Sequence, residues 1–121
     1  MRISTSAIAT GFAALTLSGG AEAQQKFDGS WSVLVVTERG ECDRAYRYPV
    51  AVEKGRVRYA GNAPFTISGQ VAASGAVQGS ITSAQGRADV RGRLSGSSGT
   101  GTWRVSGSRN CSGTWSADKR G

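Results

Sequence analysis

Apolar and polar residues alternate with a period of two along almost the whole chain after residue 24, and no segment there shows helical periodicity. Turn-forming residues interrupt this alternation at short intervals, as expected for tight connections between strands. The pattern predicts eight short strands, at residues 31–37, 46–53, 56–59, 65–71, 75–81, 87–94, 101–105 and 111–117. We therefore predict an all-β fold, built as a single antiparallel eight-stranded meander.

The two cysteines indicate how this meander closes. Cys42 follows the first predicted strand and Cys111 opens the eighth. In a closed eight-stranded barrel the last strand lies antiparallel to the first, so the two cysteines would lie close together. We predict a closed small barrel with a Cys42–Cys111 disulfide. A two-sheet sandwich is the alternative architecture, and two free thiols or an intermolecular bridge are the alternatives for the cysteines. Pro49 predicts an irregularity or an edge position in the second strand.

The first 23 residues have the pattern of a signal peptide. Arg2 supplies a positive charge, residues 7–17 form a short apolar run, and Ala21-Glu22-Ala23 places small residues at the positions that a signal peptidase reads. The run is shorter than the roughly 20 apolar residues needed to span a bilayer, and no later segment is a better candidate. We predict a signal peptide over 1–23, a β-barrel domain over 24–121, and a periplasmic or secreted protein. A packed N-terminal helix is the alternative.

The charge of the chain is strongly positive, with 15 Lys and Arg against 8 Asp and Glu, a formal net charge of +7. Six arginines fall on outward-facing positions of three predicted strands: Arg56, Arg58, Arg87, Arg91, Arg93 and Arg104. Spaced guanidinium groups can hold phosphates or sulfates bidentately. This pattern predicts an anionic envelope partner, either lipopolysaccharide, polysaccharide or lipid, and a merely solvated basic face is the alternative. Nucleic acid is not expected, because the alternation directs the aromatic rings inward. We expect a monomer.

Gly-x-Trp occurs three times, on the first, seventh and eighth predicted strands, which adjoin in a closed barrel. It contributes Trp31, Trp103 and Trp115, which we expect to form an aromatic cluster filling one end of the core. An aromatic platform for a sugar or an apolar ligand is the alternative. Five glycines share the inward face with large apolar residues: Gly69, Gly79, Gly92, Gly101 and Gly113. They either allow strands to coil and make room for indoles, or they border a ligand cavity.

Catalytic chemistry has little support in this sequence. The chain has no histidine, which removes the usual Ser-His-Asp and Cys-His arrangements and the commonest metal ligand. Glu38, Glu41 and Asp43 share a loop that could hold a hard cation, although a solvated acidic loop is the commoner arrangement. We predict a protein that is not an enzyme, with no catalytic residue, no metal site and no cofactor.

The segment Phe27-Asp28-Gly29-Ser30-Trp31 resembles the opening strand of calycin-type barrels, the lipocalins and avidins. The chain also resembles the secreted metalloprotease-inhibitor barrels of Gram-negative bacteria in its size, its eight strands and a Gly-x-Trp strand followed by a Cys. In those inhibitors the partner Cys follows soon after and an N-terminal arm blocks the protease, whereas here the second Cys is at 111 and the arm, 24–26, is very short. More broadly, the chain is similar to small exported Gly-rich β-barrel proteins of Gram-negative bacteria.

These features predict an exported, non-enzymatic binding or envelope-associated module whose basic surface takes anionic partners. The calycin resemblance implies an alternative, a carrier of a small apolar ligand. The inhibitor resemblance implies a second alternative, a secreted protease inhibitor.

Overall fold

The computed structural model describes residues 25–121 except residues 85 and 107–109, so the predicted signal peptide lies outside the described residues. A short 3-10 helix, η1 (Gln25–Phe27), leads into eight strands. These are β1 (Gly29–Arg39), β2 (Ala45–Glu53), β3 (Arg56–Tyr59), β4 (Thr66–Val71), β5 (Ala76–Ser83), β6 (Gly86–Ser95), β7 (Ser98–Ser106) and β8 (Ser112–Lys119).

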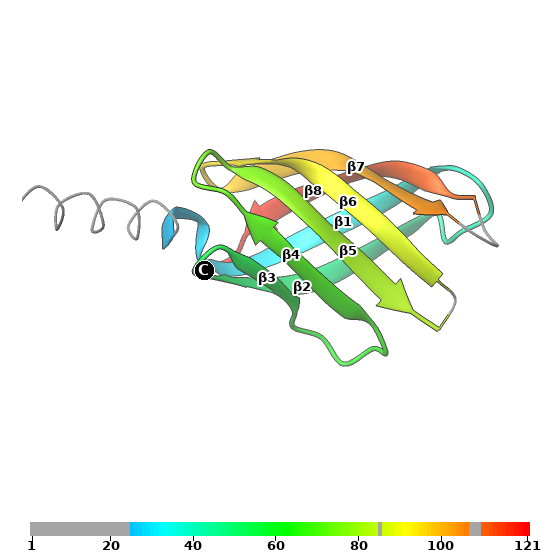
Figure 1. The fold of residues 1–121 in the computed structure, drawn as a ribbon, viewed down its shortest axis with the longest axis horizontal. Helices are drawn as coiled ribbons and strands as arrows, with labels where there is room; N and C mark the ends of the chain where they lie inside the picture. The colour runs from blue at the N-terminus through cyan, green and yellow to red at the C-terminus, as the bar shows by residue number, and fades with distance from the viewer. Residues whose placement is uncertain (1–24, 85, 107–109) are drawn as a thin grey trace, which may run out of the picture.

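Each strand pairs antiparallel with the next, and β8 pairs back onto β1, so the sheet closes into a small barrel (Figure 1). The predicted eight-stranded barrel is confirmed and the sandwich alternative is wrong. Among the described residues, no helix has the length and apolarity required to cross a membrane.

The disulfide forms as predicted. Cys42 lies between β1 and β2, Cys111 directly precedes β8, and their Cα atoms are 6.1 Å apart. The β1–β8 ladder brings them together, because Arg39 at the end of β1 pairs with Ser112 at the start of β8. The disulfide therefore clamps the seam at which the barrel closes.

Several strands are longer than the alternation alone suggests. Residues 95–98 form the tip of a tight hairpin in which Ser95 pairs with Ser98, so β6 and β7 both extend to the turn at 96–97. Gly96 adopts a φ of 62°, the left-handed conformation that two-residue hairpin loops favour. Pro49 lies within β2, but its carbonyl accepts the Ala60 N–H just beyond the end of β3. The Pro49 nitrogen, which carries no hydrogen, therefore points toward the end of β3, where the β2–β3 pairing stops. This is an edge-like position.

The two ends of the barrel receive different connections (Figure 1). The closed end holds η1, the C-terminus and the turns at 54–55, 72–75 and 96–97. The open end holds the β1–β2 and β3–β4 connections, residues 40–44 and 60–65, together with the disulfide.

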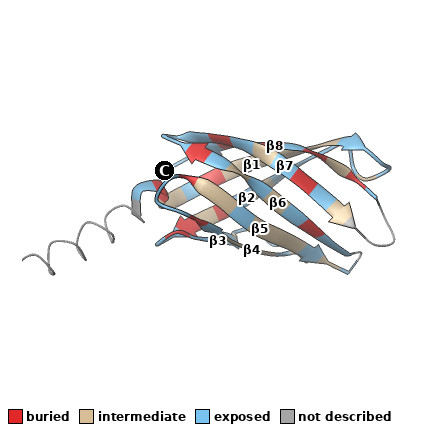
Figure 2. Ribbon diagram, turned by 45° about the horizontal axis from the view of Figure 1, so that its top comes forward, coloured by how far each residue is buried: buried red, intermediate tan, exposed pale blue. Residues whose placement is uncertain are grey.

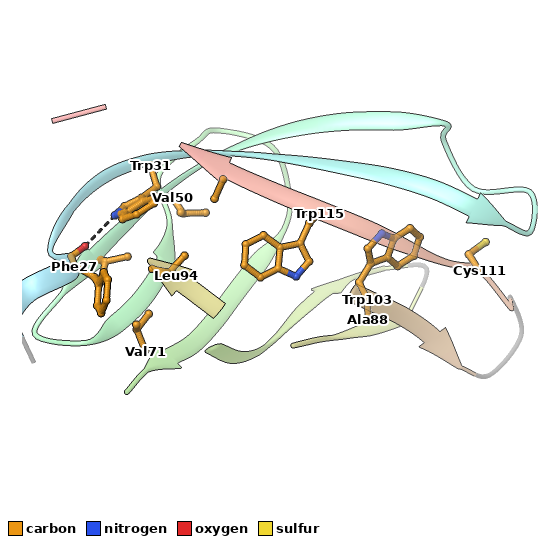
Figure 3. Close-up of a cluster of buried hydrophobic side chains, with 11 residues drawn as sticks. Phe27, Trp31, Val50, Val71, Ala88, Leu94, Trp103, Cys111 and Trp115 are labelled. Carbon is orange, nitrogen blue, oxygen red and sulfur yellow. Dashed lines mark hydrogen bonds between the residues drawn. The ribbon is translucent and has the colours of Figure 1, made fainter. Parts of the chain in front are cut away.

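The closed end is tightly packed and hydrogen-bonded. Phe27 and Trp31 are 3% and 2% exposed, and the Trp31 Nε1 donates to the Phe27 carbonyl at 2.9 Å (Figure 3). The Asp28 carboxylate accepts the backbone N–H groups of Lys54 and Gly55 at 2.8 and 3.4 Å. The segment before β1 thus caps the core and ties down the β2–β3 turn.

The three tryptophans belong to one buried core cluster but are distributed along the barrel rather than gathered at one end (Figure 3). Trp31 lies beside Phe27, Trp115 in the middle and Trp103 on the side of Cys111. The three indoles lie at different positions along the barrel axis. The reason is that β7 and β8 begin at opposite ends of the barrel, and each tryptophan is a different number of residues from the start of its strand. Since all three are at most 7% exposed, they form no external platform.

The inward glycines serve two different purposes. A Cβ at Gly92 or Gly101 would collide with the Trp115 indole, so these two glycines make room for that ring. Gly69 and Gly79 instead face each other across β4 and β5, where an added Cβ would meet the opposite backbone at 2.9 or 2.7 Å. Because glycine has no side chain, neither Gly69 nor Gly79 fills the interior at this point.

Candidate functional site

Four aromatic rings gather at the open end of the barrel. Tyr46 and Tyr48 open β2, Tyr59 ends β3, and Phe65 directly precedes β4. The Tyr46 and Tyr48 ring centroids are 4.6 Å apart, and Phe65 meets all three tyrosines edge-on at 5.3–5.8 Å. Tyr46 is 38% exposed, and it is the one large hydrophobic residue among the described residues that is classed as exposed rather than buried or partly buried. We call these four residues the aromatic cluster.

A cavity of about 400 Å³ opens beside this cluster. We call it the open cup. Its walls come from strands on opposite sides of the barrel and from the disulfide loop: Val35, Thr37, Glu41, Cys42, Asp43, Tyr46, Tyr48, Phe65, Ile81, Ser83, Gly86, Arg87, Ala88, Trp103 and Val105. This volume lies within the range of small-molecule pockets in proteins, roughly 300–1,000 Å³.

A second cavity, of about 80 Å³, lies deeper in the barrel and has an almost wholly apolar surface. Four residues line both cavities, Val35, Tyr48, Ile81 and Trp103, so the cup and the inner cavity are adjacent. Gly69 and Gly79 form part of its wall, which assigns them to the cavity rather than to indole packing.

The interior is therefore not filled along its whole length. Five inward-facing aliphatic residues of β3 to β6 are only partly buried: Val57, Ile67, Val77, Ile81 and Val90. In a barrel whose core is completely packed, such residues would be inaccessible to solvent. Figure 2 shows residues of intermediate exposure along these strands, interspersed with exposed outward positions.

Polar and charged side chains form part of the lining of the cup. Burial raises the pKa of the Tyr48 phenol above its ordinary value of 10.0, and the neighbouring Tyr46 and the Asp43 carboxylate add to the shift. The phenol is therefore neutral at physiological pH and can both donate and accept a hydrogen bond. Glu41, Asp43 and Arg87 complete the rim. A ligand here would meet apolar walls below and a few polar groups above.

The acidic loop does not assemble a metal site in the part of the chain that the structure describes, where no group of three or more potential ligands is close enough to hold an ion. Glu38 ends up in β1, whereas Glu41 and Asp43 line the cup.

Sequence reasoning did not single out the aromatic cluster, although the signal was present. Large rings occupy the inward positions nearest one end of three consecutive strands, at 46 and 48, 59, and 65. In an antiparallel barrel the start of β2, the end of β3 and the start of β4 all lie at the same end. Strand direction and residue type together therefore predict that the four rings converge at this end of the barrel.

The six predicted surface arginines all lie on the outer face of the barrel and are distributed over three strands. Arg56 and Arg58 project from β3, Arg104 from β7, and the remaining three from β6. We call these six residues the arginine face. All of them except Arg93 line one broad, open depression, whose lining comes mainly from β3 to β7 and also includes Glu38, Glu53, Ser112 and Gly113.

Half of this face lacks a charged or hydrogen-bonded partner. Arg58 pairs with Glu53 at 2.8 Å and Arg87 with Asp89 at 3.3 Å, the only two ion pairs in the described parts of the chain. Arg93 donates to the Ser74 carbonyl at 3.2 Å. The guanidinium groups of Arg56, Arg91 and Arg104 make no hydrogen bond or ion pair with any described residue.

Comparison with protein families, with curated proteins and with solved structures finds no match to this chain.

Proposed function

We propose that this protein is a calycin-like binding protein that takes a small, mainly apolar ligand through the open end of the barrel. The observation that supports this most is the cup of about 400 Å³, which lies next to an apolar inner cavity and shares four lining residues with it. An apolar ligand would gain free energy by covering the accessible aliphatic surface that the folded chain leaves unfilled.

The shape of the site limits the ligand. Its apolar part would enter between Tyr48 and Trp103, toward Val35 and Ile81. Any polar end would remain at the rim, where the phenols and the Asp43 and Arg87 side chains offer hydrogen bonds. This division, with an apolar body and a few convergent polar groups, is the usual composition of small-molecule pockets.

The expectation of export agrees with this role. The Cys42–Cys111 disulfide would persist in an oxidising compartment such as the periplasm or the extracellular space. An exported carrier would meet its ligand there.

The neutral, apolar fluorophore N-phenyl-1-naphthylamine tests the proposal, because it carries no charge that the arginine face would attract. We expect saturable enhancement of its emission by the wild-type protein. Val35 and Val36 provide a matched pair, since Val35 lines both cavities and Val36 alternates with it to the outer face of β1.

Val35→Trp should abolish the enhancement by filling the space where the cup and the inner cavity adjoin, whereas Val36→Trp should leave it unchanged. Circular dichroism and the unfolding midpoint show whether both variants remain folded. No saturable enhancement with the wild type, or equal binding by a folded Val35→Trp variant, would overturn the proposal.

A further inference from the structure

We propose that the outer surface of β3 to β7 is a second binding site, which takes a linear acidic polysaccharide. This inference does not depend on the cup, because the three arginines that carry it, Arg56, Arg91 and Arg104, line neither the cup nor the inner cavity.

The charges on this surface are arranged in two rows with a neutral strip between them. Arg56 and Arg58 form one row on β3, and the arginines of β6 and β7 form the other. No residue of β4 or β5 carries a charge. Neighbouring strands are about 4.8 Å apart, so the rows on β3 and β6 are separated by about 14 Å measured along the curved sheet.

The strip between the rows presents hydroxyl and amide groups. Ser68 and Gln70 of β4 face Ser80 and Gln78 of β5 in register, and the two serine hydroxyl oxygens lie 3.4 Å apart. All four residues line the depression described above. Such groups donate and accept hydrogen bonds, as sugar hydroxyls do.

The free arginines supply the attraction for anionic groups. Arg56, Arg91 and Arg104 have their guanidinium donors available, and planar guanidinium groups match carboxylate and sulfate oxygens in pairs. Glu53 and Asp89 partly neutralise only Arg58 and Arg87. The face therefore retains an excess of positive charge on both sides of the hydrogen-bonding strip.

This combination favours a polysaccharide over the other polyanions. Single-stranded nucleic acid uses exposed aromatic rings for stacking, and the exposed ring among the described residues, Tyr46, is on β2 at the open end rather than on this face. A membrane surface would favour apolar side chains beside the basic ones, whereas the strip carries serine and glutamine. A chain of sugars with recurring acidic groups would use both the strip and the arginines.

Alginate oligosaccharides, which are linear polyuronates, are the probe, with neutral dextran as the uncharged comparison. We expect calorimetric binding of alginate that weakens with added salt, and no binding of dextran. The triple variant Arg56→Ser/Arg91→Ser/Arg104→Ser should weaken alginate binding by about tenfold or more, since hydrogen bonds to charged groups are lost. The matched control Arg39→Ser/Arg44→Ser/Arg120→Ser removes the same charge outside the face and should change the affinity by less than about twofold.

A further variant separates sugar recognition from charge alone. Gln70→Ala, at a position that lines the depression but neither cavity of the barrel, should weaken the binding of alginate but not that of inorganic polyphosphate. Equal losses in the two arginine triples, no effect of the glutamine variant, or tighter binding of single-stranded DNA or anionic vesicles than of alginate would each overturn the inference. Naphthylamine binding should be unchanged in all of these variants, so failure here and failure of the proposed function remain distinguishable.

Discussion

The two ends of this barrel are built from the same strands but differ in how they treat apolar side chains. At the closed end, Phe27 and Trp31 are almost inaccessible and backbone hydrogen bonds join the C-terminus to β1, with the Ser30 N–H donating to the Gly121 carbonyl at 2.9 Å. At the open end, the aromatic cluster leaves Tyr46 exposed and a cup remains open beside it.

The comparison shows that a small barrel can separate stability from binding along its own axis. The closed end concentrates burial, which stabilises the fold. At the open end, the Cys42–Cys111 disulfide and the ring contacts of the aromatic cluster hold the strands in place, and a cavity remains beside them. The predictions that follow test this division.

The largest effect should come from the closed end. Trp31→Ala removes a ring that is 2% exposed together with its hydrogen bond to Phe27, and should lower the free energy of unfolding by about 3–5 kcal/mol. Tyr46→Ala at the open end, where the ring is 38% exposed, should cost about 1 kcal/mol. Denaturant unfolding measures both, and similar losses for the two variants would contradict the division between the ends.

Removal of the disulfide should have the next largest effect. Cys42→Ala/Cys111→Ala opens a link between residues 69 apart in sequence and should lower the stability by about 2–4 kcal/mol. Hydrogen exchange should accelerate first near Arg39 and Ser112, where the seam closes, and last near Trp31. A variant whose closed-end amides exchange first would show that the clamp does not act locally.

A smaller effect is expected from filling the space of an inward glycine. The Cβ of Gly101→Ala would collide with the Trp115 indole and with the Arg91 carbonyl to which that indole donates at 3.0 Å. We expect a loss of about 1–3 kcal/mol and a shift in tryptophan emission. Thr102→Ala, on the exposed outer face of the same strand, is the control, and an equal loss there would exclude the indole as the cause.

The smallest effect concerns pH. The raised pKa of Tyr48 means that the folded protein keeps this proton at pH values where the unfolded chain, with a pKa near 10.0, loses it. The folded state then binds more protons, so stability falls as the pH rises above 10.0 and levels off once the folded phenol ionises. Absorbance titration at alkaline pH should show a late-ionising tyrosine that is missing in Tyr48→Phe, and an unchanged titration would refute the assignment.

Local patterns accounted for much of the fold. The alternation in 87–94 predicted β6 within one residue at either end, and residues 56–59 were predicted as β3 with the bounds observed. The position of Cys42 after the first strand and Cys111 before the last indicated both closure and the disulfide. These features depend on neighbours along the chain or on strand order, which the sequence displays directly.

The candidate sites were only partly predictable. The arginine face follows from alternation, but its two rows and the neutral strip depend on the order of β3 to β6. The open cup was not predicted, because an unfilled interior depends on how side chains from opposite walls meet. Export and protease inhibition remain predictions of the sequence and its resemblances.

By itself, the sequence determined the strands, their number, the inward and outward sides of each, and the residues available for a clamp, because these properties follow from a period of two and from the turns. Only the tertiary structure decided that Gly92 and Gly101 accommodate an indole while Gly69 and Gly79 border a cavity. It likewise decided that four rings from three strands share the open end. Such outcomes depend on strand tilt and register around the closed barrel, which bring together residues that no local pattern relates.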